Sequence, residues 1–344
     1  MSVPKSATAT LQYLDSTQAN PAVNQSQPHH LHSSAHMSPP KVVITRNLGQ
    51  GAQAFLQSQS TDLEVAQWQS DEPCPRAWLL QTVPGATGLL IMVSDLIDTE
   101  LLSAAGPQLK TIATFSTGTD HIDLPALKAR GIRLGYITDC LSDAVADLAV
   151  MLVLMAQRRG AEALARVSRG DWPQLPWHPG LMTGPQIRGK TVGFLGFGRI
   201  AQATAKRLLG FGIAKVVYVT SKPGVSVKED YYGLSGDAEK VQVEVVSDLS
   251  RLASESDVVV VGCGLTPSTR HLVNAEFLSK MKKTAVLVNI ARGPVVDTNA
   301  LVEALDMGLI FGAGLDVIEG EPDIPADHPI LKQPRWLWSL CRTF

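Results

Sequence analysis

The sequence has few cysteines and no long apolar run. Its apolar stretches are strand-sized or interrupted by polar residues, short of the roughly 20 residues that span a bilayer. The N-terminus also lacks the charged-then-apolar pattern of an export signal. The four cysteines, at 74, 140, 263 and 341, lie far apart without metal-ligand spacing. We therefore expect isolated thiols in a reducing, cytoplasmic setting, and neither a metal nor a membrane partner.

A strong charge of either sign is missing as well. The 344 residues carry a formal net charge of −2 without a basic run or stripe, so nucleic acid is not an expected partner. With 45% hydrophobic and 18% charged residues, the composition is that of an ordinary globular protein, and the length is enough for two domains. A small-molecule site is the expectation that remains.

Apolar runs, often β-branched, alternate with helical patterns from residue 41 onward, which is typical of a doubly wound α/β fold with parallel sheets. The segment 1–40 is rich in Ser, Gln, Asn, Pro, Ala and His, and we expect a disordered leader there. A stretch at 142–159, with an early Ser/Asp capping signal, predicts a helix between two series of strands. The expected strands are 41–45, 88–93, 111–115, 191–195, 215–219, 241–246, 257–261, 285–290 and 312–317.

A glycine motif opens the second series of strands. The apolar run 191–195 leads into GFGRIA at 196–201 and then into a helical pattern. A pyrophosphate needs backbone N–H groups at close range and a helix N-terminus behind them. Gly196 would supply the turn, Gly198 the clearance and Ala201 a small helix–strand contact. The motif predicts a dinucleotide-binding site.

The end of the next strand bears on the choice of cofactor. About twenty residues beyond the glycines, a cofactor with a free ribose 2′-hydroxyl would normally meet Asp or Glu. The sequence instead has Thr220, Ser221 and Lys222. Hydroxyls and an ammonium suit a 2′-phosphate, so NADP(H) is favoured, with NAD(H) possible. The alternative is that Lys222 is a solvated loop charge.

Charged residues follow two later strands. Arg292 comes at a carboxyl strand end, where open α/β sheets bind ligands, and its guanidinium can fork onto a carboxylate and a carbonyl. Asp316 can accept a hydrogen bond from a nicotinamide amide, and Glu321 can orient a histidine. Taken alone, Arg292 is equally compatible with a structural ion pair.

Together these residues resemble the D-isomer-specific 2-hydroxyacid dehydrogenases, and within that family the glyoxylate and hydroxypyruvate reductases of animals. The likeness spans about residues 41–331. It is carried, in the family's order and at similar spacing, by STGTDH at 116–121, by 193–201, by 289–297, and by GLDV at 314–317 with Glu321-Pro322.

The resemblance implies a flavodoxin-like substrate domain at 41–141 into which a Rossmann domain, 142–325, is inserted. It also implies a homodimer built around the inserted domain, with Trp172 placed to reach a neighbouring active site. Thr117 and Gly118 would offer N–H groups to the carboxylate of a small 2-oxoacid. Further roles implied by the family are substrate binding by Arg292, carboxamide binding by Asp316, and cofactor contacts from Gly196, Gly198, Arg199, Ile200 and Leu265.

The family's proton donor has no counterpart near the end of this sequence. In the family, the segment after the position of Leu331 continues with a β-branched strand, a Pro-His-Ile-Gly turn and a closing helix. The histidine of that turn is the proton donor, and Glu321 would orient it. Here the sequence reads KQPRWLWSLCRTF over 332–344. We expect an atypical tail at 326–344, an unburied apolar run at 336–340, and impaired catalysis, since losing a general acid costs about 10²–10⁴-fold.

Three alternatives to an active NADPH-dependent reductase of glyoxylate or hydroxypyruvate stay open. The chain could be a catalytically silent nucleotide-binding protein, or an unstable product of aberrant processing. It could also be an enzyme with another 2-oxoacid preference, such as D-lactate or phosphoglycerate, because spacing alone does not place the side chains that set substrate size.

Overall fold

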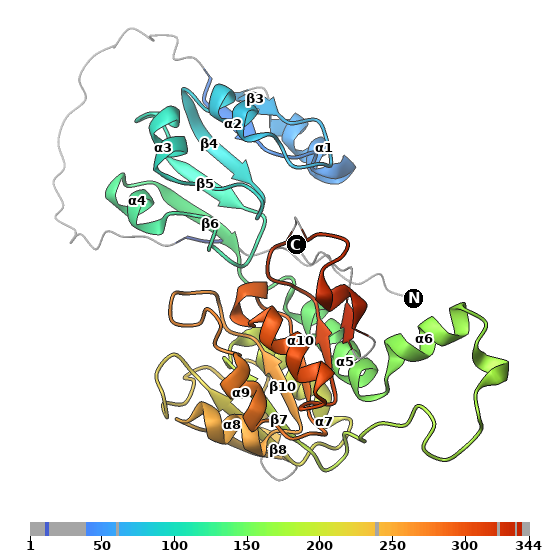
Figure 1. Ribbon diagram of the computed structural model, residues 1–344. Helices are drawn as coiled ribbons and strands as arrows, with labels where there is room; N and C mark the ends of the chain where they lie inside the picture. The colour runs from blue at the N-terminus through green and yellow to red at the C-terminus, as the bar shows by residue number, and fades with distance from the viewer. Residues whose placement is uncertain are drawn as a thin grey trace, which may run out of the picture. The chain divides into compact units, whose positions relative to one another are not determined.

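The computed structural model describes residues 11–13, 39–59, 62–237, 241–321, 324–333 and 336–338. The chain divides between Cys140 and Leu141 into two compact units, which we call unit 1 and unit 2. Each unit is a largely parallel sheet with helices packed on it (Figure 1). The α/β fold expected from the sequence is confirmed, and every expected strand is present with its ends shifted by no more than two residues.

Unit 1 contains a six-stranded sheet in the order β1-β6-β5-β4-β2-β3. Strands β2 to β6 pair in parallel, whereas β1 runs antiparallel to β6. Its strands are β1 (Leu11–Tyr13), β2 (Lys41–Ile44), β3 (Glu64–Gln67), β4 (Ala86–Ile91), β5 (Thr111–Thr114) and β6 (Arg133–Ile137). Its helices are α1 (Gly49–Gln59), α2 (Arg76–Thr82), α3 (Thr99–Ala105) and α4 (Leu124–Ala129).

Two strands of unit 1 were not expected from the sequence. β1 lies within the segment 1–40 that we expected to be disordered, and the other residues of 1–38 lie outside the described ranges. β3 is the edge strand of the sheet, and its residues are exposed or only half-buried. A strand that is solvated along one edge lacks the continuous apolar run by which the other strands are recognised.

Unit 2 contains a seven-stranded, fully parallel sheet in the order β13-β12-β11-β10-β7-β8-β9. Its strands are β7 (Thr191–Leu195), β8 (Lys215–Val219), β9 (Gln242–Val245), β10 (Val258–Val261), β11 (Val286–Asn289), β12 (Gly312–Leu315) and β13 (Trp336–Trp338). Its helices are α5 (Ser142–Gln157), α6 (Gly160–Ser168), α7 (Arg199–Leu209), α8 (Leu249–Glu255), α9 (Ala275–Lys280) and α10 (Thr298–Asp306).

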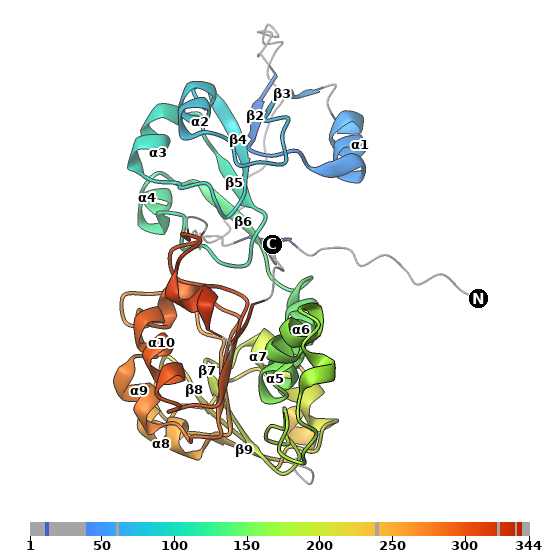
Figure 2. The ribbon, with the colours of Figure 1, turned by 45° about the vertical axis from the view of Figure 1, so that its right-hand side comes forward.

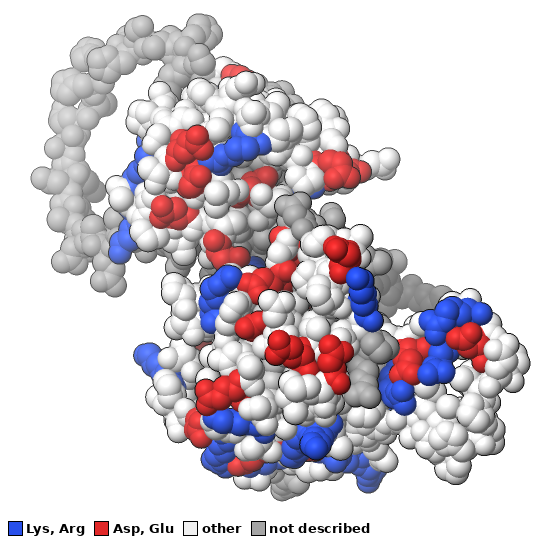
Figure 3. All heavy atoms as spheres, viewed as in Figure 1, with Lys and Arg blue, Asp and Glu red and all other residues white. Residues whose placement is uncertain are grey.

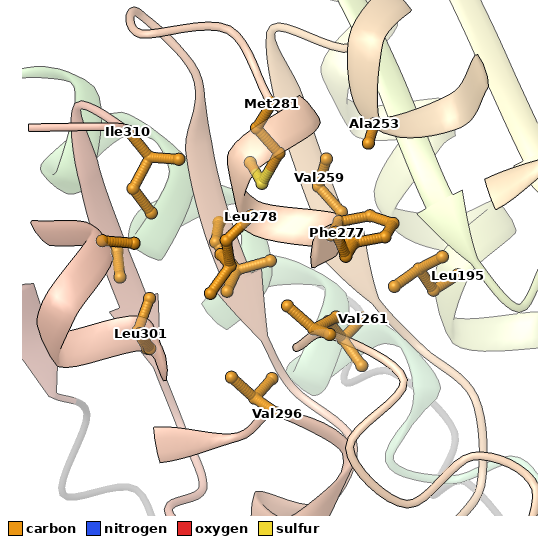
Figure 4. Close-up of a cluster of buried hydrophobic side chains, with 14 of the residues drawn as sticks. Leu195, Ala253, Val259, Val261, Phe277, Leu278, Met281, Val296, Leu301 and Ile310 are labelled. Carbon is orange, nitrogen blue, oxygen red and sulfur yellow. The ribbon is translucent and has the colours of Figure 1, made fainter. Parts of the chain in front are cut away.

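Both faces of this sheet are covered. α5 and α7 lie on one side and α8, α9 and α10 on the other, as Figure 2 shows. On the second side, Phe277 and Leu278 of α9 pack against Leu195, Val259 and neighbouring apolar side chains (Figure 4). The order of the strands reverses between β7 and β10, and in open sheets ligands bind outside the carboxyl ends at such a point.

The tail differs from expectation. Residues 336–338 were expected to lie outside the dinucleotide-binding domain, in an atypical tail with an unburied apolar run, but they form β13 and pair in parallel with β12. The backbone of this run therefore extends the sheet of unit 2 beyond the expected limit at 325. The remaining residues from 339 onward lie outside the described ranges.

The helix between the two series of strands also begins differently. Ser142 and Asp143 were expected to cap it, but the N-cap is Leu141, which makes no side-chain cap hydrogen bond. Ser142 is instead the first helical residue and is buried. The apolar face of α5 packs into the core on one side of the sheet, and this packing stabilises the helix without a side-chain cap.

Candidate active site

The turn between β7 and α7 has the geometry that a pyrophosphate needs. Gly196 has a φ of +87°, and a Cβ there would lie 2.9 Å from backbone atoms of Cys263, so only glycine fits. A Cβ on Gly198 would meet nothing within 4 Å, so the space beside the helix N-terminus is open. Gly198 is the N-cap of α7 and no side-chain hydrogen bond caps the helix, which leaves its first N–H groups available to an anion.

A pocket of about 260 Å³ lies beside this turn. Its walls come from the turn, the first residues of α7, the end of β8 and the loop that follows β8. Arg199, Thr220 and Ser221 line it, as expected for cofactor-binding residues, and so do Glu229 and Tyr231, which sequence reasoning missed. The guanidinium of Arg199 stacks over the ring of Tyr231 at 4.2 Å from the centroid.

The three residues expected to hold a 2′-phosphate have different surroundings. The Thr220 hydroxyl lies 2.8 Å from the carbonyl oxygen of Lys222 and accepts from its N–H at 3.2 Å, so it stabilises its own turn. Ser221 is exposed and lines the pocket. Lys222 is exposed and is not among the lining residues. Of the three, Ser221 has the hydroxyl best placed for a ligand.

Ile200 and Leu265 are half-buried. Ile200 packs against the core on the α5–α7 side of the sheet, and Leu265 packs against the core on the α8–α10 side. Leu265 belongs to the loop after β10, where the Thr269 hydroxyl donates to the Gly264 carbonyl oxygen at 2.8 Å. Both expected cofactor residues thus sit at the carboxyl edge of the sheet.

Cys263 lies against the glycine turn as a thiol, and burial raises its pKa. It therefore stays protonated and unreactive at neutral pH. In unit 1, burial and the nearby Asp95 carboxylate raise the pKa of Cys74 to about 12. Cys140 is also a thiol, so the three cysteines in the described part of the chain form no disulfide. Cys341 lies outside that part.

Arg292 stands in a loop that Asn289 shapes. The Asn289 amide donates to the Arg292 carbonyl oxygen at 3.0 Å, and its side-chain oxygen accepts from the Ala291 N–H at 3.0 Å. Asn289 is 1% exposed, so this turn is fixed from inside the protein. The Arg292 guanidinium is half-buried and donates to the Ala291 carbonyl oxygen at 2.8 Å. It is thereby held at the carboxyl end of β11.

Asp316 follows the neighbouring strand, β12. Its N–H donates to the Asn289 carbonyl oxygen at 2.9 Å, which ties the carboxyl ends of β11 and β12 together. Asp316 is 7% exposed. Glu321 comes after a tight turn, in which its carboxylate accepts from the Ile318 N–H. Arg292, Asp316 and Glu321 therefore belong to adjacent loops of one unit, as the sequence spacing predicts.

A third loop, at residues 270–271, contacts both the Arg292 loop and the loop after β12. The sequence did not point to this loop. His271 donates its N–H to the Pro294 carbonyl oxygen at 2.9 Å, and its Nε2 lies 3.0 Å from both carboxylate oxygens of Glu319. Arg270 pairs with Glu319 at 2.6 Å. His271 has a φ of +50°, a costly conformation that these contacts hold in place. Nothing in the one-dimensional pattern joins residues 270 and 319.

Thr117 and Gly118 belong to unit 1, in the loop after β5. The Ser116 hydroxyl donates to the Gly118 carbonyl oxygen at 2.7 Å, and it contacts the Thr114 hydroxyl at 2.8 Å. Thr114 in turn meets the His121 Nε2 at 3.0 Å. Within the described ranges the N–H groups of Thr117 and Gly118 donate to no protein group. The loop thus holds two backbone donors in a fixed turn.

Residues 150–339 match the family model described as "D-isomer specific 2-hydroxyacid dehydrogenase, NAD binding domain". The chain belongs to this family. As the resemblance implied, the glycine turn, Arg292 and Asp316 fall within the matched region. A nicotinamide dinucleotide is the cofactor of such a domain, and the glycine turn fits its pyrophosphate.

Relatives in the D-isomer specific 2-hydroxyacid dehydrogenase family cover most of the chain. It is 44% identical over 291 residues to a glyoxylate reductase/hydroxypyruvate reductase of Homo sapiens, covering 85% of this chain and 84% of the relative. A solved protein of Thermus thermophilus is 41% identical with a TM-score of 0.74, over 87% of this chain and 88% of its own.

A third relative was solved with ligands bound. It is an NADPH-dependent glyoxylate/hydroxypyruvate reductase of Sinorhizobium meliloti, in complex with NADP and malonate. It is 29% identical with a TM-score of 0.69, over 88% of this chain and 86% of its own.

Membrane spans and metal clusters are both missing from the described residues. None of the helices there has the length and apolarity that crossing a membrane requires. In the same residues, no group of three or more His, Cys, Asp and Glu side chains is arranged to hold a metal ion.

Proposed function

We propose that the chain reduces glyoxylate or hydroxypyruvate to the corresponding 2-hydroxy acid, which is the D isomer in the case of hydroxypyruvate. The observation that carries the proposal is the pair of ligand loops at the carboxyl edge of unit 2. One is the open glycine turn at Gly196 and Gly198, and the other is the Arg292 loop fixed by Asn289. The names of the relatives supply the substrate class.

The reduction adds a hydride to the carbonyl carbon and a proton to its oxygen. A nicotinamide cofactor supplies the hydride when bound. Arg292 binds the substrate carboxylate and polarises the 2-oxo group. Asp316 would accept a hydrogen bond from the carboxamide of a bound cofactor. In the family an imidazole that Glu321 would orient gives up the proton, but residues 332–344 contain no histidine, so in this chain another group or water supplies the proton.

Single-turnover oxidation of NADH and NADPH with glyoxylate tests the proposal. The chain is compared with a version in which a Pro-His-Ile-Gly turn and a closing helix follow Trp338. We expect reduction of glyoxylate in at least the second version, and faster turnover there by about 10²–10⁴-fold if a histidine acid is what it gains. Cofactor binding without reduction in either version would leave a nucleotide-binding protein and refute the reductase.

We further propose that the assembly is a homodimer built around unit 2, in a cytoplasmic setting where the thiols stay reduced. α6 buries none of its residues and exposes Leu164 and Val167, and the segment after it exposes Trp172 and Trp177. Residues 172–187 contain no Lys, Arg, Asp or Glu, and the outer part of this region is white in Figure 3. A second copy is the partner that would cover such an apolar surface.

Light scattering coupled to gel filtration tests the assembly. We expect the wild-type chain to elute as a dimer and the double variant Leu164→Glu/Val167→Glu to elute as a monomer, because two charges would be buried against an apolar surface. Ser168→Glu, an exposed polar position on the same helix, should leave the dimer intact. A monomeric wild-type chain, or a double variant that remains dimeric, would contradict this assembly.

A further inference from the structure

The loop after β8 is pinned across the start of α7 by one buried glutamine. The side-chain amide of Gln202 donates to the carbonyl oxygens of Phe197 at 3.1 Å and Glu229 at 3.0 Å. Its oxygen accepts from the N–H of Tyr231 at 2.9 Å. Gln202 is 1% exposed, so these bonds are shielded from water and hold the loop against the glycine turn.

Apolar and aromatic contacts fix the same loop further along. We call residues 227–234 the strap. Val227 and Leu234, at its two ends, pack against the core on the α5–α7 side, and Tyr231 stacks under the guanidinium of Arg199. The Leu234 N–H donates to the Asp230 carboxylate at 2.8 Å. The strap is therefore a built wall of the cofactor pocket.

This wall includes an acidic residue. Glu229 lines it together with Thr220 and Ser221, which stand at the end of β8. The Glu229 side chain is exposed and, among the described residues, makes neither a hydrogen bond nor an ion pair. The end of β8 is where a dinucleotide-binding sheet meets the adenosine ribose, usually through an acidic residue of the strand itself. Here an acidic residue of the strap, and not of the strand, is among the residues that line the pocket.

A carboxylate distinguishes the two nicotinamide cofactors. It accepts hydrogen bonds from ribose hydroxyl groups, and it repels a 2′-phosphate, which carries about two negative charges. The ammonium of Lys222 belongs to a residue outside the pocket lining, and the guanidinium of Arg199, which does line the pocket, stacks over the Tyr231 ring. We propose that Glu229 binds the ribose hydroxyls of the cofactor and that the pocket takes NAD(H) in preference to NADP(H), opposite to the expectation from Thr220, Ser221 and Lys222.

Titration calorimetry with NADH and NADPH, without substrate, tests this inference. It rests on the proposed function only in taking a nicotinamide dinucleotide as the ligand. We expect the wild-type chain to bind NADH about tenfold more tightly than NADPH, and Glu229→Gln to bring the two affinities within about threefold. The change should combine weaker NADH binding with tighter NADPH binding.

Three variants complete the test. Glu276→Gln removes the same charge from the exposed face of α9 and should leave the ratio of affinities unchanged. Lys222→Met should alter NADPH binding by less than about threefold, and Arg199→Met should weaken both cofactors alike. Thermal melting of each variant checks that it is folded.

The contrary outcomes are separable. A wild-type preference for NADPH would overturn the inference, as would a ratio that Glu229→Gln leaves unchanged. Selective loss of NADPH binding in Lys222→Met or Arg199→Met would also overturn it, by identifying another phosphate contact. These outcomes leave the proposed reductase intact. Failure to bind either cofactor would refute both proposals.

Discussion

Replacing Arg292 by alanine should lower kcat/KM for glyoxylate by about 10³-fold, close to 4 kcal/mol, because the substrate carboxylate and the polarised carbonyl lose the same charged partner. Arg292→Lys keeps the charge but not the two-pronged geometry, and a loss of about 10²-fold is expected. Steady-state kinetics on whichever version of the chain turns over provides the measurement.

The affinity for the cofactor is the control for this prediction. Arg292 is held in its loop by Asn289 and does not line the cofactor pocket, so Arg292→Ala should bind NADH as the wild-type chain does. Arg251→Gln, which removes a guanidinium from the surface ion pairs of α8, should leave kcat/KM within about twofold. Equal activities of the wild-type chain and Arg292→Ala would exclude the proposed role.

Replacing Gly293 by alanine should be nearly as damaging. A Cβ at this position would overlap the carbonyl group of Ile318 and the nitrogen of Glu319, which are backbone atoms and cannot rotate away. The loops that carry Arg292 and Asp316 would have to separate. We expect a loss of about 1–3 kcal/mol in the free energy of unfolding and of about 10²-fold in kcat/KM, since a shift of about 1 Å costs that much.

Urea unfolding and kinetics on Gly293→Ala measure the two effects separately. Gly51→Ala is the matched control, because a Cβ at Gly51, within α1, meets nothing within 4 Å. That change should be neutral or stabilise the protein by up to about 1 kcal/mol, as alanine does in helices. If Gly293→Ala were as stable and active as Gly51→Ala, the close packing of the two loops would be shown to contribute neither to stability nor to kcat/KM.

The strands could be predicted from the sequence because burial on both sides of a parallel sheet produces continuous apolar runs. β10, with four consecutive buried valines, is the plainest case. β3 was not predicted because an edge strand needs fewer apolar residues. The run 336–338 is apolar but lacks the β-branched pattern of the family's strand, and its pairing with β12 is a long-range property.

The residues of the candidate site also divide into those that could be predicted from the sequence and those that could not. Gly196, Arg292 and Asp316 could be predicted because each is tied to the end of its own strand, where sequence and position coincide. Glu229 could not, because its place in the pocket depends on Gln202, 27 residues earlier, reaching across to the strap. His271 and Glu319 meet across a separation of 48 residues. Tertiary contacts of this kind leave no periodic signal in a single sequence.

The arm that carries α6 begins after α5 and returns beside the last residue of that helix. Arg159, directly after α5, turns the chain with a φ of +52°, and Gly184 comes back so close to the Gln157 carbonyl that any side chain there would overlap it. The excursion is thus a closed loop pinched at its base. The entropy of closing such a loop grows only slowly with its length. Evolution can therefore lengthen, shorten or re-sequence the arm, and with it any surface it offers to other molecules, while the sheet that binds the cofactor stays as it is.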